Sequence, residues 1–286
     1  MNRRMIALLL AALFLLCLPG CAKKEYSEGK PKTDLLATTQ PVYQLTCALT
    51  DGTGLSVGLL ISESVSCLHD YTLTVSQMEM IEQSGLVLES GLGLENFMED
   101  VLRGKTRIDI SRNLDTLPGE DGADPHWWLD PMRYKQAAEL AAQELGAQYP
   151  EFADQISENL AAFCEKLSSL QDYGEQALSD LSCRQLVTFH DGFSYFADSF
   201  GLTIAAAMEV ESGSEPSAKE LEEIISIVEE NQIPAVFTEV NGETGAAEVV
   251  AGEAGCAVRT LDMAISNRDY FAAMRQNIDI VKEALG

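Results

Sequence analysis

Basic side chains are scarce in this chain. Its 286 residues include 19 lysines and arginines against 45 aspartates and glutamates, which gives a formal net charge of −26 at pH 7. A surface of this sign repels the phosphates of nucleic acids and the headgroups of anionic lipids, so we expect no nucleic-acid partner. The same surface raises the local concentration of cations. Charge alone does not distinguish a cation-binding protein from other acidic proteins.

Long apolar runs are lacking after the first twenty residues. The chain begins with a short cationic segment, continues through an apolar run over residues 5–18, and then reads Leu-Pro-Gly-Cys, ending at Cys21. The run is shorter than the ~20 residues of a membrane-spanning helix, which predicts a secretory signal peptide over residues 1–20. The last four residues resemble a bacterial lipobox, which implies a lipidated Cys21 as the mature N-terminus. Residues 21–40 are mostly polar and predict a flexible tether, so we expect an extracytoplasmic protein anchored to the cell membrane.

Closely spaced cysteine pairs are lacking as well. Beyond Cys21 the chain holds five cysteines at wide spacings, Cys47, Cys67, Cys164, Cys183 and Cys256. An extracytoplasmic compartment permits disulfides, but an odd number leaves at least one thiol free. The spacings indicate no particular pairing.

Short apolar runs alternate with amphipathic stretches along most of the chain. The runs predict buried strands at residues 55–61, 85–90, 106–111, 184–189, 202–208, 233–239 and 256–261. The stretches predict helices at residues 75–84, 94–104, 132–146, 217–231, 242–255 and 267–286. This alternation favours an α/β fold of parallel sheets with helices on both faces.

Residues 150–181 interrupt this alternation. Apolar residues recur there at spacings of mostly three and four, and Pro150 stands at a favourable helix-start position. The pattern predicts one helix of about 30 residues and about 45 Å, which is too long for a single strand-helix-strand unit. We therefore expect two α/β lobes, residues 41–149 and 182–286, joined by one long rigid helix.

Histidine occurs only three times, as His69, His126 and His190, and each follows a predicted strand. Asp262 follows the last predicted strand in the same way. Ligands of open parallel sheets bind outside the carboxyl ends of the strands, and three imidazoles with a carboxylate suit Zn²⁺, with Mn²⁺ as the alternative. A single loop histidine is more often a hydrogen-bonded surface residue, but three at strand ends favour a metal site. Histidine binds metal as the neutral ring, so affinity should fall below about pH 6.

Six motifs occur in order along the chain. They read LHDYTLTVSQMEMIEQSGLVLESGLGLENF, DPHWWLDPMRY, TFHDGFSYFADSFGL, EPSAKELEEII, AVFTEVN and VRTLD. Together they resemble the zinc- and manganese-binding substrate-binding lipoproteins of ABC transporters, the ZnuA-like group, over nearly all of residues 36–286. The resemblance implies a non-enzymatic protein that holds its metal in a cleft between two α/β lobes. It also implies a permease and its ATPase as partners, and we expect a monomer.

The resemblance assigns roles to individual residues. It implies that the first three motifs place His69, His126 and His190 as metal ligands, and that the last motif supplies Asp262 as the carboxylate ligand. Manganese-preferring members carry glutamate in place of His190, so the resemblance favours zinc. Glu239 matches a carboxylate near the site that could orient a ligand histidine. A solvent-facing Glu239 is the competing interpretation.

Other residues of these motifs have structural interpretations. Trp127 and Trp128 are expected to cover the cleft wall, and Asp130 with Pro131 to begin the following helix. The sequence departs from the family in two places. The segment before His126 is short and acidic and lacks the histidine-rich loop of many zinc-specific members, and the first motif continues with Thr72 and Leu73 instead of glutamate and proline.

Two other functions remain open at this point. A secreted zinc hydrolase also uses three histidines, with water as the fourth ligand, but it needs a free general base and no HExxH motif is present. A surface adhesin that does not depend on metal is the other alternative. Loss of zinc binding on substitution of His126 and His190 would separate it from the metal-binding hypothesis.

Overall fold

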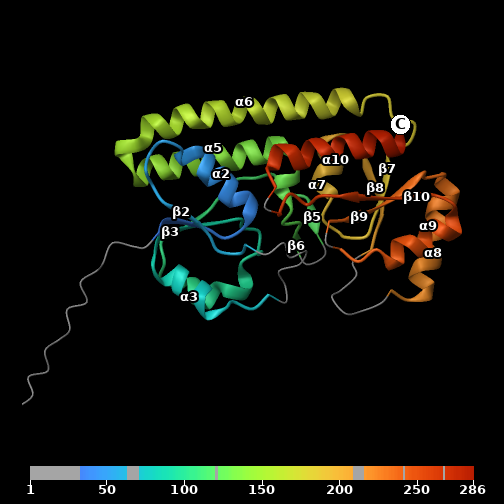
Figure 1. The fold of residues 1–286 in the computed structure, drawn as a ribbon, viewed down its shortest axis with the longest axis horizontal. Helices are drawn as coiled ribbons and strands as arrows, with labels where there is room; N and C mark the ends of the chain where they lie inside the picture. Colours follow the sequence, from blue (N-terminus) through green and yellow to red (C-terminus); the bar gives the residue numbers. More distant parts are fainter. Residues whose placement is uncertain (1–32, 63–70, 120–121, 209–215, 241, 267) are drawn as a thin grey trace, which may run out of the picture. The chain divides into compact units, whose positions relative to one another are not determined.

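Two four-stranded parallel sheets organise the chain from residue 33 onward (Figure 1). The computed structural model describes residues 33–286 apart from 63–70, 120–121, 209–215, 241 and 267, all within the unit Lys32–Gly286. The predicted fold class, two parallel-sheet lobes with helices on both faces and a long helix between them, is confirmed. The predicted signal peptide, Cys21, Cys67 and His69 lie outside the described residues.

The first sheet has the strand order β2-β1-β3-β4. Its strands are β1 (Thr33–Ala37), β2 (Val57–Leu59), β3 (Ser84–Glu89) and β4 (Arg107–Asp109). Alternate residues of β1 face opposite sides of the sheet, because side chains in a strand alternate in direction. Leu35 joins the core beneath α2 (Gln40–Thr50), whereas Leu36 joins the core on the opposite face.

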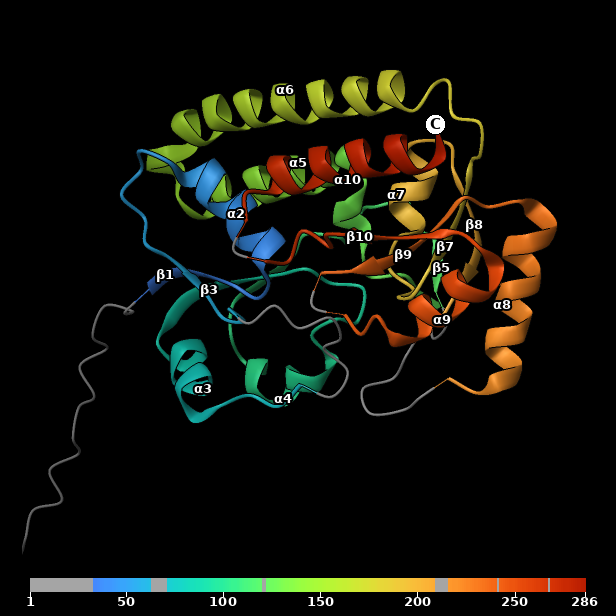
Figure 2. The same cartoon turned by 45° about the vertical axis from the view of Figure 1, so that its right-hand side comes forward.

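The opposite face of the first sheet is covered by short helices. They are α3 (Val75–Glu82), the 3-10 turn η1 (Asn96–Met98) and α4 (Glu99–Leu102), and Figure 2 shows α3 and α4 on one side of the sheet. Ile81, Met98 and Leu102 from these elements pack with Leu36 and Val87 of the sheet. Helices therefore cover both faces, as the pattern of buried strands predicts.

The second sheet has the order β10-β9-β7-β8. Its strands are β7 (Gln185–Thr188), β8 (Thr203–Ala207), β9 (Ala235–Glu239) and β10 (Ala257–Leu261). One face packs on α8 (Ala218–Asn231) and α9 (Gly245–Ala254) through Val187 and Val236. The other face packs on α7 (Ser194–Ser199) and α10 (Tyr270–Leu285) through Leu186 and Phe237.

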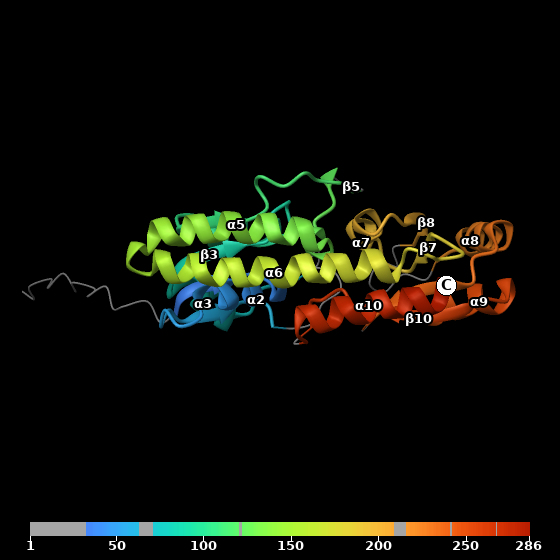
Figure 3. The same ribbon diagram turned by 90° about the horizontal axis from the view of Figure 1, so that it is seen from above.

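A long helix, α6 (Ala153–Ala177), connects the two lobes. It follows α5 (Pro131–Gln148) and the 3-10 turn η3 (Pro150–Phe152), and it contacts α2 and α5 of the first lobe and α10 of the second. Figures 1 and 3 show α5 and α10 each running alongside a different part of α6. At 1.5 Å per residue, 25 helical residues extend about 38 Å. The helix ends at Ala177, before the predicted end at residue 181.

Two predicted helix starts are confirmed. The Asp130 side chain accepts hydrogen bonds from the backbone N–H groups of Met132 and Arg133, with Pro131 as the first helical residue of α5. The helix predicted over residues 217–231 is α8, and Ser217 and Glu220 form a reciprocal capping box at its start. Both are short-range devices that satisfy free amide groups at a helix start, which is why the sequence alone reveals them.

The predicted tether over residues 21–40 is wrong at its C-terminal end. Thr33–Ala37 forms β1, which lies between β2 and β3, and the helix α2 begins at Gln40. Five residues after a polar segment are too few to show a periodic pattern. In the structure, the central position of β1 in the sheet buries Leu35 and Leu36 completely. A small antiparallel hairpin of β5 (Pro118–Gly119) and β6 (Gly122–Ala123) was likewise not predicted.

The described residues contain free cysteines and no membrane-spanning helix. Four cysteines in the described residues are free thiols, namely Cys47, Cys164, Cys183 and Cys256. From residue 33 onward, leaving aside the undescribed segments, no helix has the length and apolarity needed to cross a bilayer.

Candidate metal site at the strand ends

His126 lies in a turn that Asp124 holds in place. The turn follows the β5–β6 hairpin and leads into the 3-10 turn η2 (Trp127–Leu129). One carboxylate oxygen of Asp124 accepts the backbone N–H of His126 at 2.8 Å and lies 2.8 Å from its ring Nδ1. With Nδ1 donating to this buried carboxylate, Nε2 carries the lone pair that can bind a metal. Sequence reasoning missed Asp124, although its position two residues before His126 was visible.

His190 follows β7 and Phe189, and its ring meets that of His126. The two ring centroids lie 5.3 Å apart in an edge-to-face arrangement. Burial, together with the neighbouring His126, lowers the pKa of His190 to about 3, so the ring is neutral at physiological pH. Its Nε2 is buried and has no hydrogen-bond partner among the residues that the structure describes. A neutral imidazole with an unused nitrogen is the form in which histidine binds metals.

Glu239 ends β9 beside His190. Its carboxylate Oε1 lies 3.9 Å from His190 Nδ1, beyond hydrogen-bond distance. Because the His190 ring is neutral, this contact is not an ion pair at physiological pH. The solvent-facing interpretation of Glu239 is wrong, since the residue is only 5% exposed. Its position permits a hydrogen bond to Nδ1 after a small movement of either side chain.

Asp262 follows β10, and α10 fixes its backbone. The side chain of Asn277 accepts the Asp262 N–H at 2.8 Å and donates to the Asp262 carbonyl at 2.7 Å. The Asp262 carboxylate accepts the backbone N–H of Ala264 at 2.8 Å, and its other oxygen lies 3.9 Å from Arg268 Nη1. Asp262 is therefore a buried carboxylate, anchored at the same edge of the sheet as His190.

Two further contacts draw these strand ends together. The Trp128 indole N–H, two residues after His126, donates to the carbonyl of Met263 at 2.8 Å. A Cβ placed on Gly192 would lie 2.5 Å from Met263 Cε and 2.9 Å from His190 Nε2. The glycine at position 192 thus leaves room for both the Met263 side chain and the His190 ring. The sequence did not reveal the role of Gly192, because its neighbour Met263 is 71 positions away along the chain.

The described residues contain part of the predicted ligand set. His126 and His190 are in contact, and Asp262 is adjacent to Met263, which lies beside His190. Within the described ranges, no group of three or more His, Cys, Asp or Glu side chains is arranged to hold a metal ion. His69 lies outside these ranges. The four-ligand set of His69, His126, His190 and Asp262 therefore stays a prediction.

The tryptophans of the His126 turn are buried, as expected for residues covering a wall. Trp127 is fully buried and Trp128 is 2% exposed, and each indole N–H donates to a main-chain carbonyl. Trp128 also stacks edge-on against the His126 ring, with centroids 5.5 Å apart. The ring of His126 is thus confined by Asp124, Trp128 and His190.

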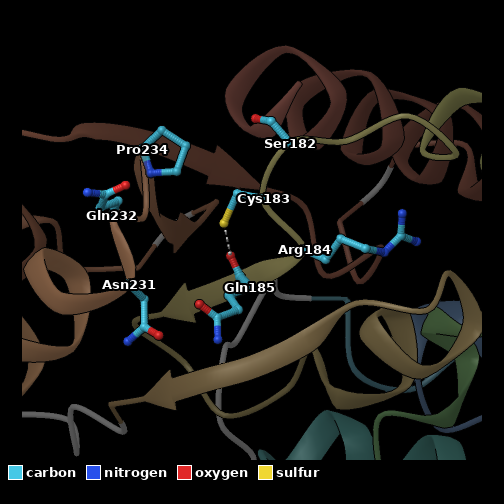
Figure 4. A pocket seen from close by; sticks show the side chains of 7 residues that line it. All are labelled: Ser182, Cys183, Arg184, Gln185, Asn231, Gln232 and Pro234. Atoms are coloured by element: carbon cyan, nitrogen blue, oxygen red, sulfur yellow. Dashed lines mark hydrogen bonds between the residues drawn. The ribbon is translucent and has the colours of Figure 1, made fainter.

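A cavity at the other edge of the second sheet is not part of this site. It has a volume of about 440 Å³ and is lined by Ser182, Cys183, Arg184, Gln185, Asn231, Gln232 and Pro234 (Figure 4). These residues stand at the amino ends of β7 and β9, whereas His190 and Glu239 stand at the carboxyl ends of the same strands. The Arg184 guanidinium is occupied by the carbonyls of Leu178, Phe200 and Gly201.

Comparison with known proteins identifies relatives over almost the whole described chain. The family model described as ZnuA, zinc-uptake complex component A periplasmic, matches residues 35–284. A zinc-binding lipoprotein AdcA of Streptococcus pneumoniae is 28% identical over 307 aligned positions, covering 97% of this chain and 60% of the relative. A manganese-binding lipoprotein MntA of Halalkalibacterium halodurans is 25% identical over 65% of each chain. This chain thus spans about 60% of the length of the AdcA proteins that it matches.

A solved structure shares the fold. A zinc-bound deletion mutant of ZnuA superposes with a TM-score of 0.79 at 29% sequence identity, covering 89% of this chain and 98% of that one.

Proposed function

Since this chain belongs to the ZnuA family, we propose that it captures Zn²⁺, with Mn²⁺ as the alternative cargo, and delivers it to the permease and ATPase of an ABC transporter. The contact between His126 and His190 carries the proposal. Asp124 occupies one nitrogen of His126, and the buried Nε2 of the neutral His190 has no protein partner in the described chain. A relative that binds zinc and another that binds manganese support the choice of cargo.

The proposed site contains four ligands. His126 and His190 bind through Nε2, and His69 and Asp262 complete a set of three nitrogens and one oxygen, which suits tetrahedral Zn²⁺. Asp124 orients His126, and Glu239 orients His190 from the opposite side of its ring. Each Asp262 carboxylate oxygen accepts one hydrogen bond, from Ala264 and Ser266, and so keeps a second lone pair that can bind the metal.

The proposed setting is the outer surface of the cell membrane. The protein acts there as a monomer, anchored through lipidated Cys21, and its acidic surface attracts divalent cations. The function is binding and release, not catalysis. In the hydrolase alternative, three histidines hold a metal-bound water and Asp262 stays distant. A metal-bound structure in which Asp262 coordinates the ion would exclude that alternative.

The test is a zinc titration of the purified mature protein against a chromogenic chelator. We expect His126→Ala and His190→Ala each to lower zinc affinity by more than about 100-fold, because even the partners of metal ligands contribute 10–100-fold. Asn231→Ala, on the cavity at the opposite edge of the second sheet, is the matched control and should leave affinity unchanged. Wild-type affinity in both histidine variants would refute the site.

Competition between Zn²⁺ and Mn²⁺ for the purified wild-type protein distinguishes the two possible cargo metals. Any site of this kind binds Zn²⁺ more tightly than Mn²⁺ in the general affinity order, so we expect zinc to displace manganese at equal concentrations. Metal analysis after dialysis against both ions measures the outcome. Retention of manganese would assign Mn²⁺ as the cargo.

A further inference from the structure

The turn after β3 is closed by a buried carboxylate. Gly91, Leu92 and Gly93 all have positive φ, with values of 82°, 53° and 87°. The Glu95 carboxylate accepts the backbone N–H of Ser90 at 2.7 Å and that of Gly91 at 3.0 Å. Three consecutive left-handed residues are costly without compensation, above all at Leu92, which has a side chain. The carboxylate of Glu95 supplies this compensation by binding the amide groups that the turn directs inward.

Glu95 also joins this turn to the neighbouring strand. The hydroxyl of Thr38, the first residue after β1, donates to Glu95 Oε1 at 2.7 Å. Glu95 is only 6% exposed, so its carboxylate needs these donors in place of water. Three donors from two strand ends therefore converge on one side chain.

The closed turn supports the residue next to His126. The carbonyl of Ser90 accepts the indole N–H of Trp127 at 3.0 Å, and Trp127 is completely buried. Gly91 packs so closely on the end of β4 that a Cβ there would lie 2.1 Å from oxygens of Asp109 and Ser111. The turn at residues 90–95 thus contacts the His126 turn through Trp127. It also contacts the end of β4, the strand that precedes the His126 turn in the sequence.

We propose that Glu95 is a positioning residue for His126. It holds the 90–95 turn so that the Ser90 carbonyl fixes the Trp127 indole, and Trp127 in turn fixes the backbone on which His126 stands. The inference rests on the proposed function, in which His126 binds the cargo metal. Glu95 itself contacts neither His126 nor any other proposed ligand in the described chain, so its effect passes through the hydrogen bond of Trp127.

A double-mutant cycle tests this route. Glu95→Gln removes one acceptor position, Trp127→Phe removes the indole N–H while keeping an aromatic ring, and a third protein combines both changes. We expect each single variant to lower zinc affinity by about 10-fold, in the range of residues that orient metal ligands. The combined variant should show about the same loss, because both changes break one chain of contacts. Losses that multiply to about 100-fold would overturn the route through Trp127.

The two tryptophans of the chain give a second readout. A ¹H–¹⁵N spectrum should contain two indole resonances, from Trp127 and Trp128, and Trp127→Phe assigns them. Glu95→Gln should shift the Trp127 indole resonance and leave that of Trp128 in place. A residue that only stabilises the fold would lower the melting temperature without this selective shift. An unchanged Trp127 resonance together with wild-type affinity would refute the proposal.

Controls separate this inference from the proposed function. Glu99→Gln removes an exposed carboxylate of the same segment, paired with Arg107, and should leave zinc affinity unchanged. Thr38→Val removes one donor to Glu95 and should produce a smaller loss in the same direction, which covers the case that Glu95→Gln does not fold. His126→Ala belongs in the same titration. If it binds zinc normally, the proposed function fails; if it loses zinc while Glu95→Gln and Thr38→Val do not, only the positioning role fails.

Discussion

The indole N–H of Trp128 donates a 2.8 Å hydrogen bond to the carbonyl of Met263, and so joins the His126 turn to the segment after β10. The hydroxyl of Tyr270, the first residue of α10, donates to the carbonyl of Trp128 at 2.8 Å. Both bonds are buried and link segments more than 130 positions apart. The His126 turn is therefore attached to the second lobe, although its sequence precedes the long helix. This attachment favours small lobe shifts over a wide hinge motion in the proposed capture and release of metal.

Trp128→Phe should destabilise the metal-free protein. It leaves the Met263 carbonyl buried without its donor, which costs about 1–3 kcal/mol of unfolding free energy. For a domain of this size, each kcal/mol lowers the melting temperature by roughly 2–4 °C, which thermal unfolding measures. Tyr173→Phe, which removes an exposed hydroxyl bonded to Asp279, is the control and should change little. Equal melting temperatures for wild type and Trp128→Phe would show that the bond does not contribute.

The placement of His190 and Asp262 at strand ends was predictable from the sequence. His190 directly follows an apolar run, and Asp262 ends another, so their location required only the alternation of strands and helices. The contacts that shape the site were not predictable in this way. The role of Asp124 depends on the local turn that places it beside the His126 ring, and that of Gly192 on a contact with Met263, which is distant in sequence. The role of Glu95 depends on a glycine-containing turn, and glycines in a sequence do not show which turn they form.

The sequence did not predict the first strand, β1, for a related reason. Thr33–Ala37 is short, and its burial depends on β2 and β3, which pair with it from both sides. Sequence patterns report periodicity within a segment, whereas this strand is defined by its neighbours in space. The long helix is the opposite case: its apolar stripe repeats over seven turns, so it was predictable to within a few residues at each end.

Gly192→Ala should weaken zinc binding. The added Cβ would lie 2.5 Å from Met263 Cε and 2.7 Å from His190 Cδ2, so the His190 ring or the Met263 side chain must move. We expect a loss of about 10-fold or more in the chelator competition, comparable with the loss of an orienting partner. Gly252→Ala, at an open position in α9, is the matched control and should stabilise the protein slightly. Wild-type affinity in Gly192→Ala would mean that the site tolerates the displacement.

His190 should make the metal-free protein acid-sensitive. Its pKa in the folded state is about 3, against 6.5 for an unperturbed histidine. Between these values the unfolded chain binds a proton that the folded protein does not, so the free energy of unfolding falls as pH falls below 6.5. From pH 7 to pH 5 the loss is about 2 kcal/mol at 1.36 kcal/mol per unit. Urea unfolding of wild type and His190→Gln at both pH values measures it. A stability difference between the two proteins that does not change with pH would contradict the low pKa.

Glu95 should have the opposite pH dependence. Burial raises its pKa to about 7 from an ordinary value of 4.5, although the donors from Thr38, Ser90 and Gly91 favour the charged form. Between these values the folded protein retains a proton that the unfolded chain releases, so the contribution of Glu95 to stability is present at acidic pH and is lost as pH rises towards 7.

Glu95→Gln does not titrate and therefore isolates this contribution. From pH 5 to pH 7, the unfolding free energy of wild type should fall by about 2 kcal/mol relative to Glu95→Gln, measured by urea unfolding without metal. His190 changes the free energy of unfolding in the opposite direction over the same pH range, so the two effects nearly cancel in wild type. The pH dependence of Glu95→Gln would therefore show the contribution of His190, and that of His190→Gln would show the contribution of Glu95. The exposed Glu99→Gln should leave the profile almost unchanged. Parallel profiles for wild type and Glu95→Gln would mean that Glu95 is ionised throughout this range.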